Sequence, residues 1–439
     1  MNNQTNLEDQ KTYENQNSNA NRKFIVLDIV FYGSSLNYDQ GAGNYQELKK
    51  ITKWDGNQYT LVSRYALRYS ILETGKNLGL WELADASHLQ RAGEGEKTVI
   101  QPAIDKLLSG EILNYPEFDL FGYLVTNTVP QNAREAPVKI SHAVSLTPYR
   151  YDSHFSGNLG LARRMIEKTG KMDPNLFIVE EHQTYYIYNV VIDVDKIGKN
   201  EVYLSKKIDK NLEVKVEEDS EKYKIIIKKK KDKNNEENKE ESYEVKKNSD
   251  KIKIEKKDLK EIYCFIQTLV SNDENDKNKI IKERIKQLIK SILYLNRDIK
   301  GRREILSPKL LIAGFYKNVP YKSYKDRIIL SDEYEEIFGE KRESEDNEVK
   351  IIRKMVKLKK PYFILKGMET QEIKSIDDVA KEDISSSSKE KEDNCLLKEI
   401  DNIFSSNEEH LEKLLIFKSP EIEVRFESTK HSANNQEKN

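Results

Sequence analysis

The segment 23-KFIVLDIVFY-32 alternates apolar and other residues as a β-strand does, and it sets the pattern for the chain. Ile25, Leu27, Ile29 and Phe31 fall on one face of that strand. Further along, the hydrophobic pattern predicts a helix over about 63–76, strands over 118–126, 185–194 and 309–316, and an amphipathic helix over 279–296. This order is typical of a ferredoxin-like (RRM-type) unit. We therefore expect an α+β fold with a modified RRM core over 22–330, whose open sheet face is a common RNA platform.

Several stretches lie outside this pattern. Residues 1–21 are polar and are expected to form a disordered tail. A polar, aromatic and basic excursion runs from about 127 to 184. A Lys/Glu-rich insertion over about 199–258 is interpreted as a long charged hairpin around Tyr223–Ile227 with a mobile tip. Region 331–439 has low hydrophobic density and no assigned fold, with a linker over 385–391 and a tail in its last dozen residues.

The charge balance excludes a protein-wide basic field, because 74 Lys and Arg stand against 75 Asp and Glu. Any nucleic-acid site must therefore come from local clusters of cations. Cys264 and Cys395 are far apart, which fits a reducing cytoplasm and no disulfide framework. The sequence contains no run of about 18 apolar residues, so no membrane span is predicted. We expect a cytoplasmic protein without a membrane partner.

The first candidate site is the glycine-containing loop that follows the first strand. Glycine lets a backbone approach a phosphate closely, and adjacent lysines neutralise its charge. The residues expected to contact RNA here are Asn37, Gly41, Gly43, Asn44, Lys49 and Lys50. The alternative, which turn chemistry alone favours, is a flexible connection between strand and helix.

The second candidate site is the start of the predicted helix, where Ser63 is the expected N-cap. Free N–H groups at a helix start attract phosphate. Arg64 and Arg68 lie four residues apart on one side and are expected to form a guanidinium clamp. The other side is expected to carry Val62, Ala66, Tyr69 and Glu73, broadened by Tyr65 and Leu72. The alternative is that both arginines merely lie on a solvated face.

Two more basic segments complete the candidate sites. Residues 138–143 alternate like an edge strand with a polar face, and an aromatic and basic run follows at 149–155, as suits single-stranded RNA. Gly301, after the second amphipathic helix, is expected to be its C-cap within a cationic knot. The residues expected to bind RNA are Arg134, Lys139, Ser141, His142, Arg150, Lys300, Arg302 and Arg303. The alternative for the first segment is an ordinary surface loop. The alternative for the second is that its cations only stabilise the helix C-terminus through the helix dipole.

Four ordered motifs resemble one family. The first combines residues 37–44, 48-LKK-50 and 62-VSRYALR-68. The other three are 118-FDLFGY-123, 136-APVKISHA-143 and 295-LNRDIKGRR-303. Together they are similar to the backbone subunit of type I-B Cascade, the Cas seven, DevR-type family. The resemblance covers roughly 23–316 without the charged insertion.

The resemblance implies a modified RRM core with an extended thumb, for which 146–182 is the best candidate. It also implies that several copies assemble head to tail on one CRISPR guide RNA and present its bases to target DNA. The implied partners are the guide RNA, target DNA through the guide, other copies of the chain and other Cascade subunits. The long insertion and the C-terminal region depart from the family pattern.

Two other functions remain as alternatives. Related type III backbone subunits cleave RNA with a loop aspartate and a metal ion, and Asp39 occupies a comparable loop, with His142 and His154 as possible helpers. A single loop aspartate is more often structural, and no spacing indicates a metal site, so we expect no catalysis, metal or cofactor. A DNA-binding autoregulator needs a DNA-reading element, and no helix-turn-helix pattern is found.

Overall fold

The computed structural model describes residues 22–41, 43–93, 95, 98–209, 212–229, 240–249, 252–269, 274–345, 348–381 and 396–427. The tail expected over 1–21, the linker expected over 385–391 and the last dozen residues lie outside the described residues. The described part combines helices with a larger number of strand residues, so the α+β prediction is confirmed. None of its helices is long and apolar enough to cross a membrane.

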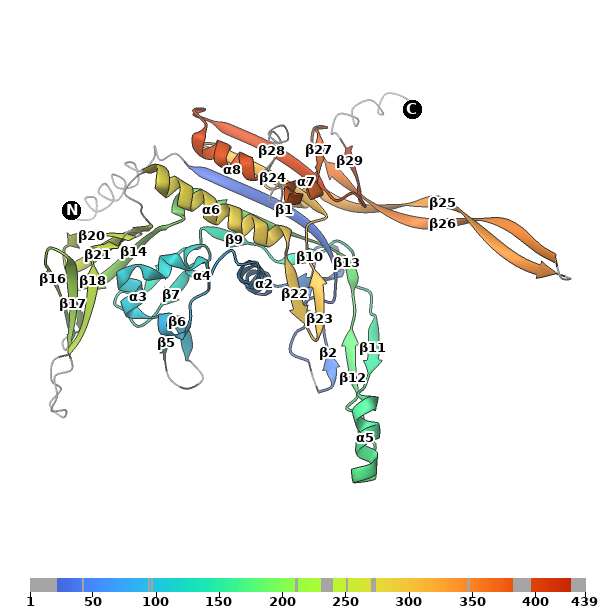
Figure 1. Cartoon of the computed structure of the whole chain (residues 1–439), viewed down its shortest axis with the longest axis horizontal. Helices are drawn as coiled ribbons and strands as arrows, with labels where there is room; N and C mark the ends of the chain where they lie inside the picture. The colour runs from blue at the N-terminus through green and yellow to red at the C-terminus, as the bar shows by residue number, and fades with distance from the viewer. Residues whose placement is uncertain are drawn as a thin grey trace, which may run out of the picture.

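The main sheet is centred on the first strand (Figure 1). In spatial order it contains β27 (Ile373–Ser375), β28 (Leu411–Lys418), β24 (Leu310–Lys317), β1 (Lys23–Ser34), β13 (Gln183–Asp193), β10 (Ala143–Ser145), β4 (Gln58–Val62) and β3 (Lys50–Thr52), and β9 (Val138–Ile140) also pairs with β13. Both neighbours of β1 are antiparallel to it, with Ile29 opposite Tyr188 and Leu311. The four residues predicted to share one face of β1 do so in the largest buried cluster.

Three helices cover that face of the sheet: α2 (Arg64–Asn77), α6 (Glu274–Leu293) and α8 (Leu396–Ser405). The predicted stripe of α6 is confirmed, because Ile281, Ile285, Leu288, Ile289 and Ile292 are all buried. Burying such a stripe against a sheet stabilises the fold by roughly 1.5–3 kcal/mol per large side chain. The C-terminal helix α8 adds to this layer, so the poorly assigned C-terminal region contributes to the main core.

The opposite face of the sheet is covered as well. It packs against β25 (Ile328–Glu345) and β26 (Glu348–Lys366), which β29 (Glu423–Glu427) joins. Phe363 and Leu365 of β26 are fully buried there. The expectation that this face is an open RNA platform is therefore wrong over these strands. Beyond the body, β25 and β26 continue as a long two-stranded ribbon (Figure 1).

The strand expected over 118–126 does not form as predicted. Its first part is the short helix α4 (Pro116–Asp119), and only β7 (Tyr123–Val125) is extended, paired with β8 (Asn132–Arg134) away from the main sheet. Pro116 favours a helical first turn. Gly122 has a φ of 69° and lies so close to the Arg134 carbonyl that a Cβ would come within 2.3 Å of it. The place beside β13 is taken instead by β10.

The Lys/Glu-rich insertion is larger than the predicted hairpin and extends to Leu269. It consists of β14 (Lys199–Ser205), β15 (Lys207–Asp209), β16 (Leu212–Glu218), β17 (Lys222–Lys229), β18 (Glu240–Lys246), β19 (Asn248–Ser249), β20 (Ile252–Leu259) and β21 (Ile262–Leu269). These strands form two four-stranded antiparallel sheets. Alternating apolar residues such as Val202, Ile225 and Phe265 fill the space between them with side chains of α3 (Ile104–Ser109). The lysines and glutamates occupy the outward positions, as in any half-exposed strand.

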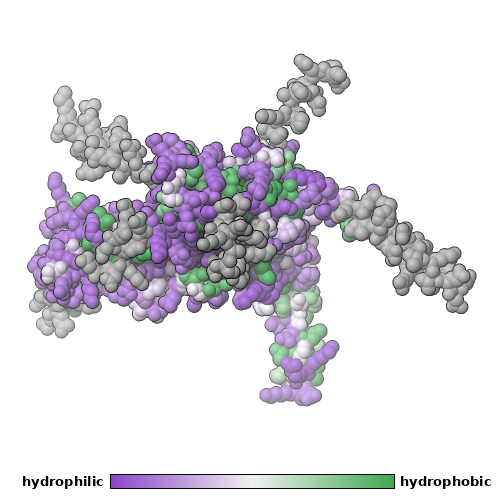
Figure 2. Space-filling model, turned by 45° about the horizontal axis from the view of Figure 1, so that its top comes forward, coloured by the Kyte–Doolittle hydropathy of each residue, from purple (hydrophilic) through white to green (hydrophobic). Residues whose placement is uncertain are grey.

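The stretch 146–182, here called the arm, projects from the body (Figure 1). It contains β11 (Ser153–Ser156), α5 (Leu159–Thr169) and β12 (Phe177–Glu180), and β12 pairs with β2 (Tyr45–Gln46). The surface of the arm is partly hydrophobic (Figure 2), since Leu161, Met165 and Ile166 of α5 are exposed. The remaining elements are η1 (Ala86–His88), β5 (Leu89–Ala92), β6 (Val99–Pro102), η3 (Glu111–Asn114), η4 (Val194–Lys196), β22 (Asn296–Ile299), β23 (Arg302–Ile305), η5 (Lys325–Arg327) and α7 (Ile376–Lys381).

Candidate nucleic-acid interface

The glycine-containing loop lies against the base of the arm and the start of α2. The Asn37 side-chain oxygen accepts a hydrogen bond from the Ser63 amide (2.9 Å), and the Asn44 carbonyl accepts one from the Ile178 amide (2.9 Å). A Cβ at Gly41 would come within 2.0 Å of the Tyr45 carbonyl, so this position requires glycine. Gly43 has a φ of 60° and open space around it, which leaves the loop accessible.

The two lysines of this loop differ in their surroundings. Lys50 is largely buried and its ammonium lies 2.8 Å from carboxylate oxygens of both Glu47 and Glu180. Glu180 is buried and also accepts hydrogen bonds from the Tyr45 hydroxyl (2.6 Å) and the Leu48 amide. Burial raises the pKa of Glu180, but the hydrogen bonds from Lys50, Tyr45 and Leu48 outweigh burial and lower it. Lys50 therefore fixes the base of the arm, whereas Lys49 forms a surface ion pair with Asp39 (3.2 Å).

The segment 296–305 also lies against this loop, as a hairpin of β22 and β23. Gly301 is not a helix C-cap, because α6 ends at Leu293; Lys300 and Gly301, both with positive φ, form the hairpin turn. The Lys300 ammonium lies 3.8 Å from the centre of the Tyr38 ring. Arg302 donates hydrogen bonds to the Ser34 (3.0 Å) and Ser35 (3.1 Å) carbonyls. The structure thus brings the first and fourth predicted motifs together.

The start of α2 is built as predicted at its cap and differently at its faces. The Ser63 hydroxyl accepts a hydrogen bond from the Ala66 amide (3.2 Å), so the N-cap prediction is confirmed. Arg64 is exposed, but Arg68 is half-buried and donates to the Glu117 carbonyl (3.0 Å). The expected clamp of two guanidinium groups is therefore not formed. The expected apolar face is correct in part: Val62 and Leu72 are buried, but Tyr65 and Tyr69 are 65% and 62% exposed while Ser70, Thr74 and Gly75 are buried.

The third predicted motif divides between the site and the core. The Nδ1 atom of His142 accepts a hydrogen bond from the Arg64 amide (2.9 Å), which places His142 beside the start of α2. Arg134 is buried, and its guanidinium lies 2.6 Å from the Asp119 carboxylate, so it is not available to bind RNA. Other predicted residues lie at or near the surface. The Ser141 hydroxyl accepts a hydrogen bond from the Asn189 amide, Lys139 forms an ion pair with Glu135, and Arg303 forms one with Asp298. Arg150 is exposed.

Lys325, which the sequence patterns did not single out, lies within electrostatic range of His142, and Lys53 lies within range of Lys325. Partial burial, Arg64 and Lys325 together lower the pKa of His142. Burial lowers the pKa of Lys53, and Lys325 lowers it further although Asp55 and Asp326 act in the opposite direction. Within the described residues, no carboxylate forms an ion pair with Arg64, Lys53 or Lys325. We call these three cations with His142 the cationic cluster.

Like charges that form no ion pair with a carboxylate repel one another and attract an anion. Two exposed aromatic rings stand on the same helix as Arg64: Tyr65, whose ring centre lies 5.0 Å from the Arg64 guanidinium, and Tyr69, which are 65% and 62% exposed. Cations for phosphates and rings for bases are the two components of a single-stranded nucleic-acid site. The one signal for Lys325 in the sequence is the basic run 322-KSYKDR-327, which lies outside the four motifs.

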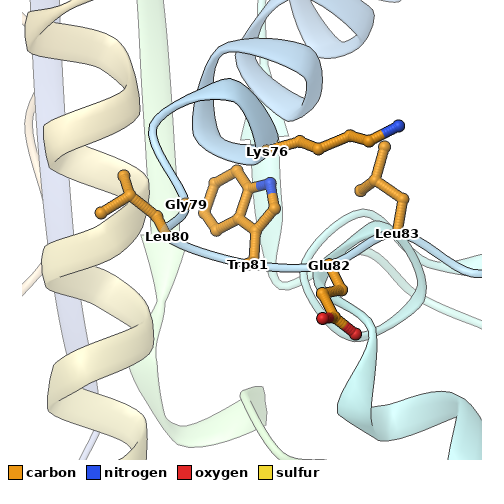
Figure 3. Close-up of a pocket in the computed structure, with 6 residues that line it drawn as sticks. All are labelled: Lys76, Gly79, Leu80, Trp81, Glu82 and Leu83. Atoms are coloured by element: carbon orange, nitrogen blue, oxygen red, sulfur yellow. The ribbon is translucent and has the colours of Figure 1, made fainter.

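A hollow of about 620 Å³ lies at the other end of α2 (Figure 3). The Trp81 indole fills much of its wall, donating a hydrogen bond to the Leu72 carbonyl (2.9 Å) and lying against Gly75. Lys76 and Glu82 are the charged residues in its lining. A single pair of opposite charges gives this hollow no preference for an anion, so we exclude it as the nucleic-acid site.

The loop aspartate considered for catalysis is exposed and forms an ion pair with Lys49. Hydrogen bonds from the Gln40 amide and Lys49 lower the pKa of Asp39. The described residues contain no group of three His, Cys, Asp or Glu side chains that could hold a metal ion.

The family described as CRISPR-associated negative auto-regulator DevR/Csa2 matches residues 25–337, well over half of the chain. The chain belongs to this family. The resemblance seen in the sequence is therefore confirmed at the level of the DevR/Csa2 family. The match includes the main sheet through β24, helices α2 and α6, the arm and the cationic cluster. It ends at 337, so α8 and β28 lie beyond it.

Comparison of this DevR/Csa2 chain with solved structures gives distant similarities. One is a chain of a "CRISPR RNA-guided surveillance complex, pre-nicking", with 10% identity, a TM-score of 0.37, and coverage of 69% of this chain and 81% of that chain. Another belongs to a "Type IV-B CRISPR Complex", with 13% identity, a TM-score of 0.23, and coverage of 39% and 73%. TM-scores this low carry no structural argument. No curated protein matches the chain.

Proposed function

We propose that this protein is a non-catalytic, guide-RNA-binding backbone subunit of a type I-B Cascade surveillance complex in the cytoplasm. The observation that carries the proposal is the cationic cluster at the start of α2, where His142 is hydrogen-bonded to the Arg64 amide and Arg64 lies beside the exposed rings of Tyr65 and Tyr69. Membership of the DevR/Csa2 family supports the CRISPR context. The spatial order β24, β1, β13, β10, with α2 and α6 on one face, supports an RRM-like core.

In this proposal the RNA backbone runs along the start of α2 and the glycine-containing loop, at the base of the arm. Arg64 and Lys325 neutralise phosphates there, and the accessible loop around Gly43 allows close approach. Affinity then comes from phosphates and backbone shape rather than base edges, so the guide sequence remains available for pairing with target DNA. Further copies of the chain occupy successive stretches of the guide, with the arm as the thumb, beside other Cascade subunits.

Labelled guide RNA incubated with the protein and magnesium is expected to stay intact and bound, because Asp39 is paired with Lys49 and stands apart from other metal ligands. Filter retention measures binding, and a denaturing gel measures cleavage. Asp39→Ala is the matched control and should behave as the wild type. Site-specific products that disappear in Asp39→Ala would establish a ribonuclease instead. Double-stranded DNA from its own promoter is the competitor, and preference for it would favour an autoregulator.

A further inference from the structure

The turn between β3 and β4 holds Trp54 almost entirely in solvent. The side chain is 98% exposed, more than any other large apolar residue described. The turn itself is tightly bonded: the Gly56 amide donates to the Lys53 carbonyl (3.0 Å) and the Lys53 amide to the Asn57 carbonyl (3.1 Å). Asp55 accepts from the Asn57 amide (3.0 Å) and the Tyr59 hydroxyl (2.7 Å). An ordered turn therefore presents the indole at a fixed place.

An indole in water is unfavourable, and a ligand that covers it gains both apolar burial and stacking. Trp54 has no packing role that would explain it, because so little of its surface touches the protein. Trp81, the other tryptophan, shows the contrast: its indole donates to the Leu72 carbonyl and lies against Gly75. Trp54 is thus available to a partner, and its surroundings indicate which kind.

The charges beside Trp54 favour an anionic partner. Lys53, the preceding residue, lies 3.8 Å from the centre of the Tyr59 ring and is close to Lys325 in the cationic cluster. Asp55 stays charged beside Lys53, but both of its oxygens accept hydrogen bonds within the turn, from the Asn57 amide and the Tyr59 hydroxyl. Asp326 forms no ion pair with Lys53. An apolar protein partner would have to desolvate these cations without compensation, whereas a nucleotide offers a ring and a phosphate together.

We propose that Trp54 stacks on a base of single-stranded nucleic acid whose phosphates lie on Lys53 and Lys325. The inference rests on the proposed function and extends the interface from the start of α2 to the tip of the β3–β4 hairpin. Stacking is indifferent to base identity, so Trp54 adds affinity without adding sequence preference. A stacked base at this position is withdrawn from pairing with a complementary strand.

The experiment uses tryptophan emission, because Trp54 and Trp81 are the only tryptophans in the chain. Short single-stranded RNA, or single-stranded DNA of the same sequence, is added to the full-length wild type and to Trp54→Phe. Quenching is expected in the wild type, while the remaining Trp81 emission of Trp54→Phe stays constant. Fluorescence anisotropy of labelled strands gives affinities in parallel. Trp54→Ala is expected to bind about 5- to 150-fold more weakly, with Trp54→Phe in between.

Each outcome decides the matter. Quenching by RNA but not by DNA shows that the site binds RNA. Equal quenching by both shows that it binds single-stranded nucleic acid of either type. Full RNA affinity without quenching overturns the role of Trp54 and leaves the proposed function standing. If neither the RNA nor the DNA binds, both the role of Trp54 and the proposed function are overturned. Emission that changes with protein concentration alone places Trp54 in a contact between copies and also overturns the inference. Unchanged thermal unfolding of the Trp54 variants shows that any loss is one of binding.

Discussion

Asp119→Asn is expected to lower the free energy of unfolding by about 3–5 kcal/mol, because it leaves the buried guanidinium of Arg134 and the partly buried guanidinium of Arg284 without a counter-charge. The Asp119 carboxylate is fully buried and lies 2.6 Å from Arg134 and 2.5 Å from Arg284. It also accepts a hydrogen bond from the Gly198 amide (2.8 Å), which joins the main core to the inserted sheets. Urea unfolding followed by circular dichroism measures the change.

The matched control is Asp298→Asn, which removes an equally close carboxylate from Arg303 at an exposed site. Solvent screens this pair, so the control should change the free energy of unfolding far less than Asp119→Asn does. Equal effects of the two substitutions would contradict the structural role of Asp119. The comparison also tests the assignment of Arg134 to the core and not to the RNA site, since a buried arginine stabilises the fold and does not reach RNA.

The double substitution Arg64→Glu with Lys325→Glu is expected to weaken RNA binding by at least about 100-fold. Each charge-assisted phosphate contact contributes roughly 1.5–3 kcal/mol, and the new carboxylates also repel the strand. The slope of log affinity against log salt should fall by about 1.4, which corresponds to two lost phosphate contacts on a single strand. Fluorescence anisotropy across a series of salt concentrations measures both quantities.

Folding should be unaffected, because neither Arg64 nor Lys325 pairs with a described carboxylate and His142 receives its hydrogen bond from the Arg64 backbone. Lys139→Glu with Arg303→Glu makes the same change of charge at two cations already paired with Glu135 and Asp298. This control should weaken binding only slightly. Comparable losses in both variants would show that the chain binds RNA through overall charge and not through the cationic cluster.

The main strands and the helix α6 could be predicted because their patterns are strict. The first strand alternates along its length, and α6 carries five buried residues at helical spacing. Helix α2 departs from this hydrophobic pattern. Its buried face includes Ser70, Thr74 and Gly75, and a Cβ at Gly75 would come within 2.6 Å of Ser291 on α6. Small residues allow two helices to pack closely, while the exposed tyrosines mislead a hydrophobic pattern.

Charge patterns were the least reliable guide to position. Arg134 and Lys50 have the residue types expected of a phosphate site, yet buried carboxylates hold both of them, 15 residues away for Arg134 and 130 residues away for Lys50. Such pairings depend on tertiary contacts that no local pattern contains. The insertion over 199–269 misled for a related reason, since its abundant lysines and glutamates conceal an alternation that builds two sheets.

The candidate site was predicted in part. The motifs identified Arg64, His142 and the loop around Gly43, which the structure places at the start of α2 or next to it. They did not identify Lys325, which reaches the cationic cluster from a segment more than 180 residues beyond His142. They also did not identify Trp54, whose importance depends on exposure and not on residue type.

The RNA content of the protein purified from its host within its native complex tests the central claim most directly. After gentle purification, the bound nucleic acid is extracted, digested separately with ribonuclease and deoxyribonuclease, and sized on a gel. A guide-RNA-binding subunit predicts one discrete, short, ribonuclease-sensitive RNA that remains bound at low salt and dissociates at high salt. Protein that carries no RNA, or a broad mixture of unrelated lengths, would contradict the account.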